Sequence, residues 1–560
     1  MDKQFLFERN LLALSRTDSA LCARLCAAET TLGRYRFVES KNGALLPAWV
    51  DGTGAAHTLH SLAAPEKEAR RLLDTAGDEG FIVLLGLGGG FYAEAALERG
   101  ETARVLVIDF DINGVAELLC HHQYIKIFND SRFSILVDPD ENDLRGALLA
   151  LYQPALHGGL KTFPLRARTD FDAAHFAPAA ATLKKTLESI AEDYSVQSCF
   201  GRRWYANIIR NCLLSEEQHH ILPPVASAAV CAAGPSLDKQ MPVIKSERAN
   251  YFLIATDTSL PALLHAGIRP DAIISIDCQH ISYVHFAGCN VEDIPVFLDL
   301  ASPPLIAGRS KKIFFFSGGH PLTNYISAKY RTFPVLDTSG ANVTYAGVTL
   351  AEKLGARRIT VFGADFSYPK GAAYAKAAYF YPFFHRRQNR LAPAFSMLNA
   401  FIYKSPSLRR IENEYTWYYE TKPMLRYRQR LEEKSRSMEA LLIAAPGGGA
   451  PIHCGRSAGG DVPGARALRP LPVFASGRAQ TSAKTFLSGY RSAVLALPPF
   501  GENVTTYIEK LNTEERQVFV TLLPAAAAIR SRNNTPTPTA LLDEAKHFCA
   551  SKIEQLLKVR

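Results

Sequence analysis

The sequence lacks several features that would place it in a class at once. No apolar run approaches the ~20 residues that a membrane-spanning helix needs. The first ten residues, MDKQFLFERN, mix acidic and basic side chains and have no apolar core, so no signal peptide is expected. The ten cysteines form no two CxxC pairs, and packing explains Cys22 and Cys26 better than zinc does. We therefore expect a cytoplasmic protein with reduced thiols, no membrane contact and no metal.

A dense basic stripe interleaved with aromatic residues, typical of nucleic-acid binding, is also missing. The net charge is +9 and the pI is near 8.9, which suits an acidic small ligand such as a nucleotide or a sialic-acid-like sugar. With 560 residues the chain is too long for one core. We predict an N-terminal domain over residues 1–215, a central domain over 220–400 and a mostly helical domain over 401–560.

The N-terminal domain contains half of a Rossmann pattern. The apolar run Phe81–Leu85 ends in the glycine-rich stretch Gly86–Gly90, and a later strand ends in Asp109. The dinucleotide fingerprint fails because position 91 is Phe, and the acid common before a methyltransferase loop is absent at Leu84. We expect no cofactor here. Asp109-Phe110-Asp111 imitates a DxD motif, but its place on a second Rossmann strand makes that a coincidence.

The central region alternates apolar strands with helices. The runs lack strict alternation, as is typical of parallel strands covered on both faces. They are Val225–Ala233, Tyr251–Ala255, Ala272–Ile276, Ile294–Leu298, Lys312–Phe316 and Ile359–Phe362. This pattern predicts an α/β doubly wound sheet in a Rossmann-like domain. From about residue 400 the pattern changes: Leu408–Glu439 is charged with apolar residues at helical spacing, and Ala445–Gly464 is a Gly/Pro/Ala-rich loop.

A Gly-Pro-Ser turn joins the first central strand to its helix. Gly234 lets the backbone approach a ligand closely, and Pro235 fits the first turn of a helix, where a missing amide costs nothing. Ser236 can cap the helix or donate to a phosphate oxygen. The helix N-terminus adds free amides and a partial positive charge. The turn is either a phosphate-binding loop or an ordinary Ser-capped turn.

Other polar residues follow neighbouring strands of the same predicted sheet. Asp257 and Asp277 each come directly after a strand, and Asp365 follows the last strand through Gly363 and Ala364. The carboxyl ends of parallel strands meet at one edge, where open α/β sheets bind ligands. An acid there commonly binds ribose hydroxyls, although each could also be a helix N-cap. The polar turn Thr338–Asn342 belongs to the same set.

Several stretches that include these residues resemble a known family. The matching stretches are Ala233–Asp238, Ala262–Asp271, Ser275–Asp277, Ser339–Asn342, Leu350–Gly355 and Phe362–Phe366. They resemble the motility-associated factor family of flagellin glycosyltransferases, whose core is similar to the archaeal hydroxymethylpterin diphosphokinase. The resemblance implies a sialyltransferase-like fold and transfer of a nonulosonic acid, pseudaminic or legionaminic in type, from a CMP-sugar to flagellin Ser/Thr hydroxyls. The chain departs from the family pattern at Ala341 and Ala364, which bears on donor contacts.

The residues expected to bind this donor lie on the predicted edge and in the segment that follows Asp365. They are Gly234, Pro235, Ser236, Asp257, Ser259, Gln279, Ser339, Gly340, Asn342, Lys370 and Tyr374. The donor is the CMP-sugar, with no further cofactor and no metal, because a monophosphate leaving group does not require one. The positive groups would neutralise the phosphate as the glycosidic bond breaks.

A general base must take the proton of the acceptor hydroxyl. His320, which follows the strand Lys312–Phe316, is the first candidate, and its alternative is an exposed loop histidine. Asp277 and Asp365 compete with it. Two other functions stay open: diphosphate transfer to a pterin alcohol, and a non-catalytic flagellin chaperone acting through the C-terminal helices. The basic, aromatic zone Tyr379–Arg430 is either a solvated face or a docking surface.

Overall fold

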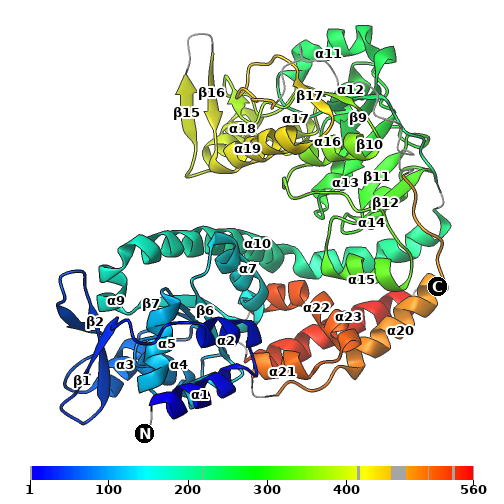
Figure 1. The fold of residues 1–560 in the computed structure, drawn as a ribbon. Helices are drawn as coiled ribbons and strands as arrows, with labels where there is room; N and C mark the ends of the chain where they lie inside the picture. Colours follow the sequence, from blue (N-terminus) through cyan, green and yellow to red (C-terminus); the bar gives the residue numbers. More distant parts are fainter. Residues whose placement is uncertain are drawn as a thin grey trace. The chain divides into compact units, whose positions relative to one another are not determined.

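The computed structural model describes residues 3–218, 220–412, 416–455, 474–501, 503–532 and 537–558. By its internal contacts the chain forms two compact units, residues 1–201 with 496–548 and residues 202–495 with 549–560 (Figure 1). Helix α10 (Ala173–Leu214) and helix α23 (Pro538–Lys558) contribute to both units. Residues 401–495 thus pack with the central region, and much of the remaining C-terminal part packs with the N-terminal residues.

The first unit holds two small sheets and their helices. Its strands are β1 (Tyr35–Glu39), β2 (Leu45–Val50), β3 (Ala56–Thr58), β4 (Phe81–Leu85), β5 (Arg104–Asp109), β6 (Phe133–Val137) and β7 (Leu160–Pro164). Its helices are α1 (Lys3–Leu14), α2 (Ser19–Cys26), α3 (Pro65–Asp74), α4 (Phe91–Glu98), α5 (Ile112–His121), α6 (Ile125–Phe128), α7 (Glu141–Leu151), α8 (Pro154–His157), α9 (Arg166–Phe171), α21 (Val504–Lys510) and α22 (Thr513–Arg530). The order β6-β5-β4-β7 is parallel throughout, which confirms a Rossmann-like lobe.

The second unit is built on a seven-stranded parallel sheet. The strands are β8 (Ser227–Cys231), β9 (Phe252–Thr256), β10 (Ala272–Ser275), β11 (Val296–Asp299), β12 (Ile313–Phe316), β13 (Arg358–Phe362) and β17 (Leu441–Ala444), in the order β12-β11-β10-β9-β8-β13-β17. Every residue of β10, β11 and β12 is buried, as the unbroken apolar runs predict. The doubly wound α/β fold expected of this region is confirmed.

Helices cover this sheet and lead into its loops. They are α11 (Leu237–Ser246), α12 (Leu260–His265), α13 (Ile281–His285), α14 (Pro304–Ala307), α15 (Pro321–Lys329), α16 (Val343–Lys353), α19 (Lys422–Ser437) and α20 (Ala483–Ala496), with 3-10 turns at Ser215–Glu217 and Arg248–Asn250. Helix α16 packs directly on the sheet, where Tyr345, Ala346 and Val348 join one core with Val230 and Ile274. The same core includes Leu431 of α19.

A small layer of strands and helices follows the sixth strand of this sheet. It contains β14 (Tyr368–Pro369), α17 (Phe380–His385), α18 (Ala394–Tyr403), β15 (Arg409–Glu412) and β16 (Trp417–Glu420). The helix expected over Leu408–Glu439 therefore begins only at Lys422. The aromatic run Trp417–Glu420 pairs as a strand with β14 and β15, and Pro423 stands in the first turn of α19, where proline starts helices.

Candidate functional site

The strand order of the large sheet reverses between β8 and β13. Strands β8 to β12 follow one another in one direction, whereas β13 and β17 lie on the other side of β8. The loops after β8 and β13 therefore leave the sheet side by side at its carboxyl edge. Open α/β sheets bind ligands in the crevice at such a reversal. The Gly-Pro-Ser turn follows β8, and Asp365 follows β13, so both lie at this point.

Asp365 binds the Gly-Pro-Ser turn directly. Its Oδ2 accepts the Ser236 N–H at 2.8 Å and its Oδ1 accepts the Ser236 hydroxyl at 2.5 Å. The glycine-rich loop after β17 closes the arrangement, because the Gly448 N–H donates to Ser236 Oγ at 2.8 Å and the Gly449 N–H donates to the Asp365 carboxylate. A Cβ on Gly234 or Gly449 would overlap Asp365. Three loops thus share one buried carboxylate.

This contact changes how the turn must be understood. The N–H and hydroxyl of Ser236, which were expected to bind a phosphate, donate to Asp365 instead. The side chain of Asp365 is buried. Burial raises the pKa of Asp365, while its hydrogen bonds from Ser236 oppose that rise. The first three N–H groups of α11 are also paired, with carbonyls of the turn itself at 3.0–3.3 Å. The segment after β14 is tied to the same turn, since the Ala375 N–H donates to the Ala233 carbonyl at 2.9 Å and the Lys376 N–H to Asp238 at 3.2 Å.

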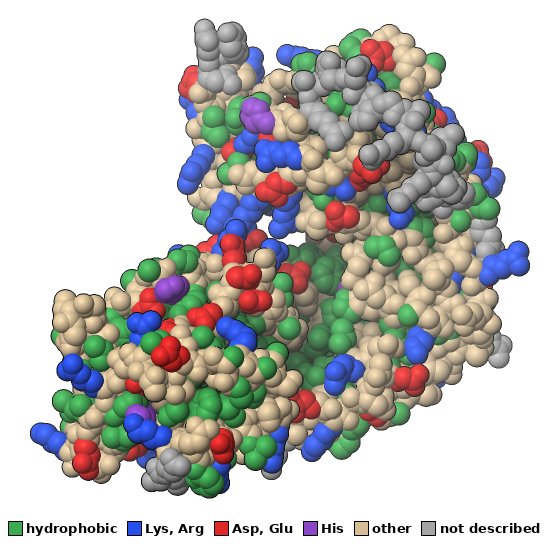
Figure 2. All heavy atoms as spheres, in the orientation of Figure 1, with side chains coloured by type: hydrophobic (Ala, Val, Ile, Leu, Met, Phe, Trp, Pro, Cys, Tyr) green, Lys and Arg blue, Asp and Glu red, His purple; other side chains and the backbone are tan. Residues whose placement is uncertain are grey.

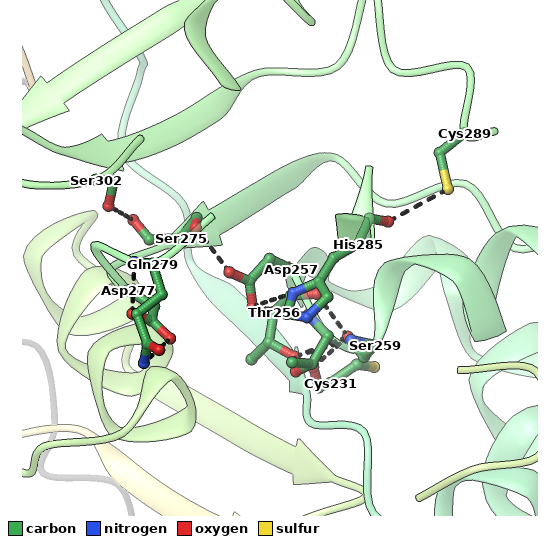
Figure 3. Close-up of polar contacts among 11 residues, drawn as sticks. Cys231, Thr256, Asp257, Ser259, Ser275, Asp277, Gln279, His285, Cys289 and Ser302 are labelled. Carbon is green, nitrogen blue, oxygen red and sulfur yellow. Dashed lines mark hydrogen bonds and ion pairs between the residues drawn. The ribbon is translucent and has the colours of Figure 1, made fainter. Parts of the chain in front are cut away.

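Asp257, at the end of β9, lies in a buried polar cluster (Figure 3). Its Oδ2 accepts the Ser275 hydroxyl at 2.7 Å and its Oδ1 accepts the Thr258 N–H at 2.7 Å. Ser259 is fully buried and donates to the Cys231 carbonyl at 2.7 Å. Both side chains are used inside the protein, and only 2% of Asp257 is exposed, so its carboxylate is not presented to a ribose hydroxyl in this structure.

His285 lies beside Asp257 and was not identified from the sequence. Its Nδ1 is 3.6 Å from Asp257 Oδ1, and 5% of its side chain is exposed. Neither ring nitrogen has a hydrogen-bond partner within the described residues. The ring of Tyr379 covers it, with centroids 4.1 Å apart. No motif signals this pair, because His285 ends the short helix α13, 28 residues after Asp257.

Asp277, after β10, is the more accessible carboxylate of the group. Its Oδ1 accepts the Gln279 N–H at 2.9 Å, and the Gln279 side-chain amide lies 3.5 Å from Oδ2 (Figure 3). The carboxylate is half-buried. Burial raises the pKa of Asp277; the charge of Asp257 raises it further, and His285 lowers it. A carboxylate with a raised pKa at the rim of a sheet edge can accept a proton.

Asp299, at the end of β11, is a further carboxylate of this edge that the sequence analysis missed. It accepts the N–H groups of Ala301, at 2.7 Å, and Gly318. Only 6% of the residue is exposed, and burial raises its pKa to about 7. The signal was present in the sequence, since Asp299 closes an apolar run as Asp257 and Asp277 do.

Two asparagines of α10 hold the loops at this edge. Asn207 donates to the carbonyls of Cys278 and Ala301, and Asn211 donates to those of Leu300 and Ser302, at 2.7–3.3 Å. Their spacing of four residues places both on one face of the helix. The loop after β10, which carries Asp277, and the loop after Asp299 are therefore fixed from one side.

His320 caps α15. Its Nδ1 accepts the Leu322 N–H at 3.1 Å, so the neutral ring carries its proton on Nε2, which is buried. Burial lowers the pKa of His320 to about 3, and its ring packs edge-on against Trp204 at 5.6 Å. Neither nitrogen is available to accept a proton from a substrate. The alternative of an exposed loop histidine does not describe this buried ring either.

The turn before α16 keeps an exposed serine at the edge. Asn342 caps the helix by accepting the Tyr345 N–H at 2.9 Å, and its side-chain amide donates to the Gly340 carbonyl. Ser339 is exposed, and its carbonyl accepts from Arg430 at 2.6 Å. Ser339 can therefore contact a ligand, whereas Gly340 and Asn342 shape the turn.

Lys370 and Tyr374 flank the segment tied to the Gly-Pro-Ser turn. Lys370 is exposed and takes a left-handed backbone, with φ of 50°. Tyr374 packs against Phe380 with ring centroids 4.9 Å apart, and burial raises its pKa. Lys370 and Lys376 are exposed cations of this segment that can meet an anionic ligand, and Tyr374 is largely a packing residue.

The glycine loop of the first unit is filled by protein side chains. A Cβ on Gly88 would overlap His60 and Leu165, and the Gly89 N–H donates to His60 Nε2 at 2.9 Å. Asp109 accepts the Leu87 N–H at 2.7 Å and lies 3.3 Å from the guanidinium of Arg168. Asp109 and Arg168 thus form an internal ion pair beside the glycine loop.

The chain has relatives among known proteins. Residues 203–371 match the family model of 6-hydroxymethylpterin diphosphokinase MptE-like proteins. An uncharacterized protein of Treponema pallidum (strain Nichols) is 32% identical over 155 residues, 26% of this chain and 74% of that protein. A second one is 32% identical over 99 residues, 18% of this chain and 35% of that protein.

The fold has a counterpart among solved structures. The structure of MAf glycosyltransferase from Magnetospirillum magneticum AMB-1 superposes with a TM-score of 0.59 at 15% identity, covering 100% of this chain and 95% of that one. At this identity the likeness is one of fold. No helix in the described part of the chain is long and apolar enough to cross a membrane.

Proposed function

Since the chain belongs to one family with the Treponema pallidum protein, carries an MptE-like domain and has the fold of a Maf glycosyltransferase, we propose that it is a glycosyltransferase. The proposed donor is a CMP-activated nonulosonic acid of the pseudaminic or legionaminic type. The proposed acceptors are Ser and Thr hydroxyls of flagellin in the cytoplasm, modified for flagellar assembly and motility. No cofactor besides the donor is proposed.

One observation carries the proposal: the reversal of strand order falls between the strands that lead to Ser236 and Asp365. Asp365 and the loop Gly447–Gly449 hold the Gly-Pro-Ser turn rigid at the start of α11. The exposed Lys370 supplies positive charge for the phosphate of departing CMP. A preformed site of this kind needs no rearrangement when charge develops.

The proton acceptor we propose is Asp277. It is half-buried at the rim, its pKa is raised, and its carboxylate is held by Gln279. Asp365 is ruled out as a base in this scheme because the Gly-Pro-Ser turn uses both of its oxygens. His320 is ruled out because Nδ1 caps α15 and Nε2 carries the proton. Two neighbours act on the pKa of Asp277: the charge of Asp257 raises it, and His285 lowers it.

The test is direct transfer in vitro. Purified protein, unmodified flagellin and a CMP-nonulosonic acid should give flagellin with added sugar mass and an equal amount of CMP. A thermal-shift series of CMP, CDP, UDP, GDP and ATP should show stabilisation by CMP, because a ligand at saturating excess stabilises the fold by a few kcal/mol, of order RT ln(1 + [L]/Kd). Unchanged flagellin mass with every CMP-sugar offered would contradict the proposal.

A second candidate is favoured by the family match over residues 203–371. In that case the chain would transfer diphosphate from ATP to a pterin alcohol. Stabilisation by ATP with Mg²⁺ but not by CMP, together with AMP release in the presence of 6-hydroxymethylpterin, would decide for this reaction.

A further inference from the structure

The layer around α18 has a one-sided charge. Between Asp365 and Glu412 the chain carries eight Lys and Arg residues and no Asp or Glu. This surplus nearly equals the net charge of +9 of the whole protein. Figure 2 shows Lys and Arg side chains gathered around the part of the surface that holds β15, β16 and α19, with hydrophobic side chains between them. The basic character of the protein is therefore local.

Helix α18 carries apolar side chains toward its own core and toward solvent. On the core side Ile402 is buried, and Phe401 meets Phe380 with ring centroids 4.7 Å apart. On the solvent side Phe395 is 74% exposed and Tyr403 56%, and Leu391, in the turn before the helix, is 94% exposed. Large apolar groups so exposed within one short segment mark a candidate contact surface.

The three exposed side chains lie within thirteen residues of the sequence and are called the stripe here. Phe395 and Tyr403 belong to α18, whereas Leu391 lies in the turn before it. The ten residues of the helix span about 15 Å. Tyr403 is held in place, because its hydroxyl donates to the Tyr419 hydroxyl at 3.0 Å. Most of the stripe is thus part of an ordered helix with its own core.

Cations lie at both ends of the stripe. Arg386, Arg387 and Arg390 precede it and Lys404 follows it, all exposed. The Arg387 guanidinium lies 3.8 Å above the Phe383 ring, and the Lys404 ammonium lies 4.6 Å above the Phe401 ring. In the described part of the chain no carboxylate pairs with Arg386, Arg387 or Arg390. The three guanidinium groups keep their charge available to a partner.

We propose that this surface, Leu391, Phe395 and Tyr403 with Arg386, Arg387, Arg390 and Lys404, docks an acidic amphipathic segment of the acceptor protein. The proposal rests on the proposed function for the acceptor's identity. The occupant is a short helix with apolar side chains on one face and Asp or Glu at both ends. Apolar side chains provide the buried centre of such an interface and charges at its rim set orientation and speed of association.

The dimensions favour a polypeptide over a lipid surface or a nucleic acid. Three apolar side chains on and beside a helix about 15 Å long match one short helix, whereas membrane affinity grows with apolar area spread over a whole face. Stacking of successive bases needs a row of free ring faces. The rings of Phe383 and Phe401 are covered by Arg387 and Lys404, which leaves Phe395 and Tyr403 in this segment.

Binding to unmodified flagellin by the full-length protein tests the docking surface. We expect Phe395→Ser and the triple variant Arg386→Glu/Arg387→Glu/Arg390→Glu each to raise the dissociation constant roughly tenfold or more. Binding of the wild type should weaken with added salt. Leu305→Ser is the matched control, an apolar residue 56% exposed elsewhere in the same unit. Circular dichroism melts verify that each variant folds.

Release of CMP from the CMP-sugar without flagellin separates the two proposals. Both variants should hydrolyse the donor like the wild type while the KM for flagellin rises. Flagellin binding and KM unchanged in both variants would overturn the docking surface and leave the transferase standing. Flagellin binding that depends on Phe395, with no sugar transfer and no CMP release with or without flagellin, would retain the surface and contradict the transferase. If vesicles of phosphatidylglycerol and phosphatidylcholine, or single-stranded DNA, bind through Phe395 while flagellin does not, the occupant is wrong.

Discussion

The chain contains two parallel Rossmann-like sheets, and their carboxyl edges differ in kind. At the edge of β4 and β5 the glycine loop is filled by His60 and Leu165, and Asp109 is paired with the buried Arg168. At the edge of β8 to β13 polar groups are held by loops, and Asp277 stays half-buried. The same strand-turn-helix pattern therefore builds a packed core in one unit and a candidate site in the other. The difference lies in the side chains that other segments bring to each edge, because His60, Leu165 and Arg168 fill the first one.

The largest expected effect is on Asp277. Asp277→Asn should lower the turnover of sugar transfer by about 10²–10⁴, the usual contribution of a general base, with little loss of stability because the residue is half-buried. Steady-state kinetics measure the turnover, and chemical denaturation measures the free energy of unfolding. In the first sheet, Asp109→Asn should lower the free energy of unfolding and leave the turnover nearly unchanged. A turnover that survives Asp277→Asn would remove this residue from the mechanism.

Arg168 gives the matching test in the first sheet. Arg168→Met leaves Asp109 charged and buried without its partner, which costs about 3–5 kcal/mol in the free energy of unfolding. Urea denaturation measures it. Arg70→Met is the control, since the Arg70–Glu98 pair is exposed on both sides and contributes little. Nucleotide binding gained or lost in Arg168→Met would show that the filled edge is in fact a site.

Asp365 should matter for stability and for donor binding together. Asp365→Asn replaces an acceptor oxygen by a donor opposite the Ser236 N–H or hydroxyl, and we expect a loss of about 1–3 kcal/mol in the free energy of unfolding. The same variant should weaken CMP binding, because the turn at α11 loses its anchor. Calorimetric titration with CMP measures this. CMP affinity equal to the wild type would separate the turn from the donor site.

Asp299 predicts a dependence of stability on pH. Its folded pKa of about 7 lies above the unfolded value of 3.8, so the folded state binds the proton more tightly. This contribution is fully present below pH 3.8 and is lost as the pH rises through 7, on the order of a few kcal/mol. Asp299→Asn cannot ionise, and its stability should fall less than that of the wild type between pH 4 and 8. Parallel curves for both proteins would contradict the raised pKa.

The smallest effect is expected from His285. His285 lowers the pKa of Asp277, so His285→Gln should raise that pKa and move the acidic limb of the rate profile to higher pH. His265→Gln, an exposed histidine of the same unit, should leave the profile in place. A shift toward lower pH would mean that His285 does not act on Asp277 through its charge.

The sequence predicted the sheets well because their strands are unbroken apolar runs. Asp257, Asp277 and Asp365 were placed correctly at strand ends for the same reason. Prediction from the sequence failed where a contact joins segments that are far apart in the chain. Nothing in the residues around Ser236 announces that Asp365, 129 positions away, takes its donors, or that His320 faces inward as a cap. β17 was missed because four apolar residues after a charged helix carry no period of their own.

Local pattern alone determined which segments are buried strands, where the glycine turns lie and which acids end a strand, because these depend on residues close in the chain. The availability of those groups was decided by tertiary structure. Asp365 and Asp257 became internal acceptors, Arg168 filled the N-terminal edge, and Asp277 kept its partial exposure. The physical reason is that a buried charge or donor must be satisfied by whatever group the fold brings to it, and that group can come from any distance along the chain.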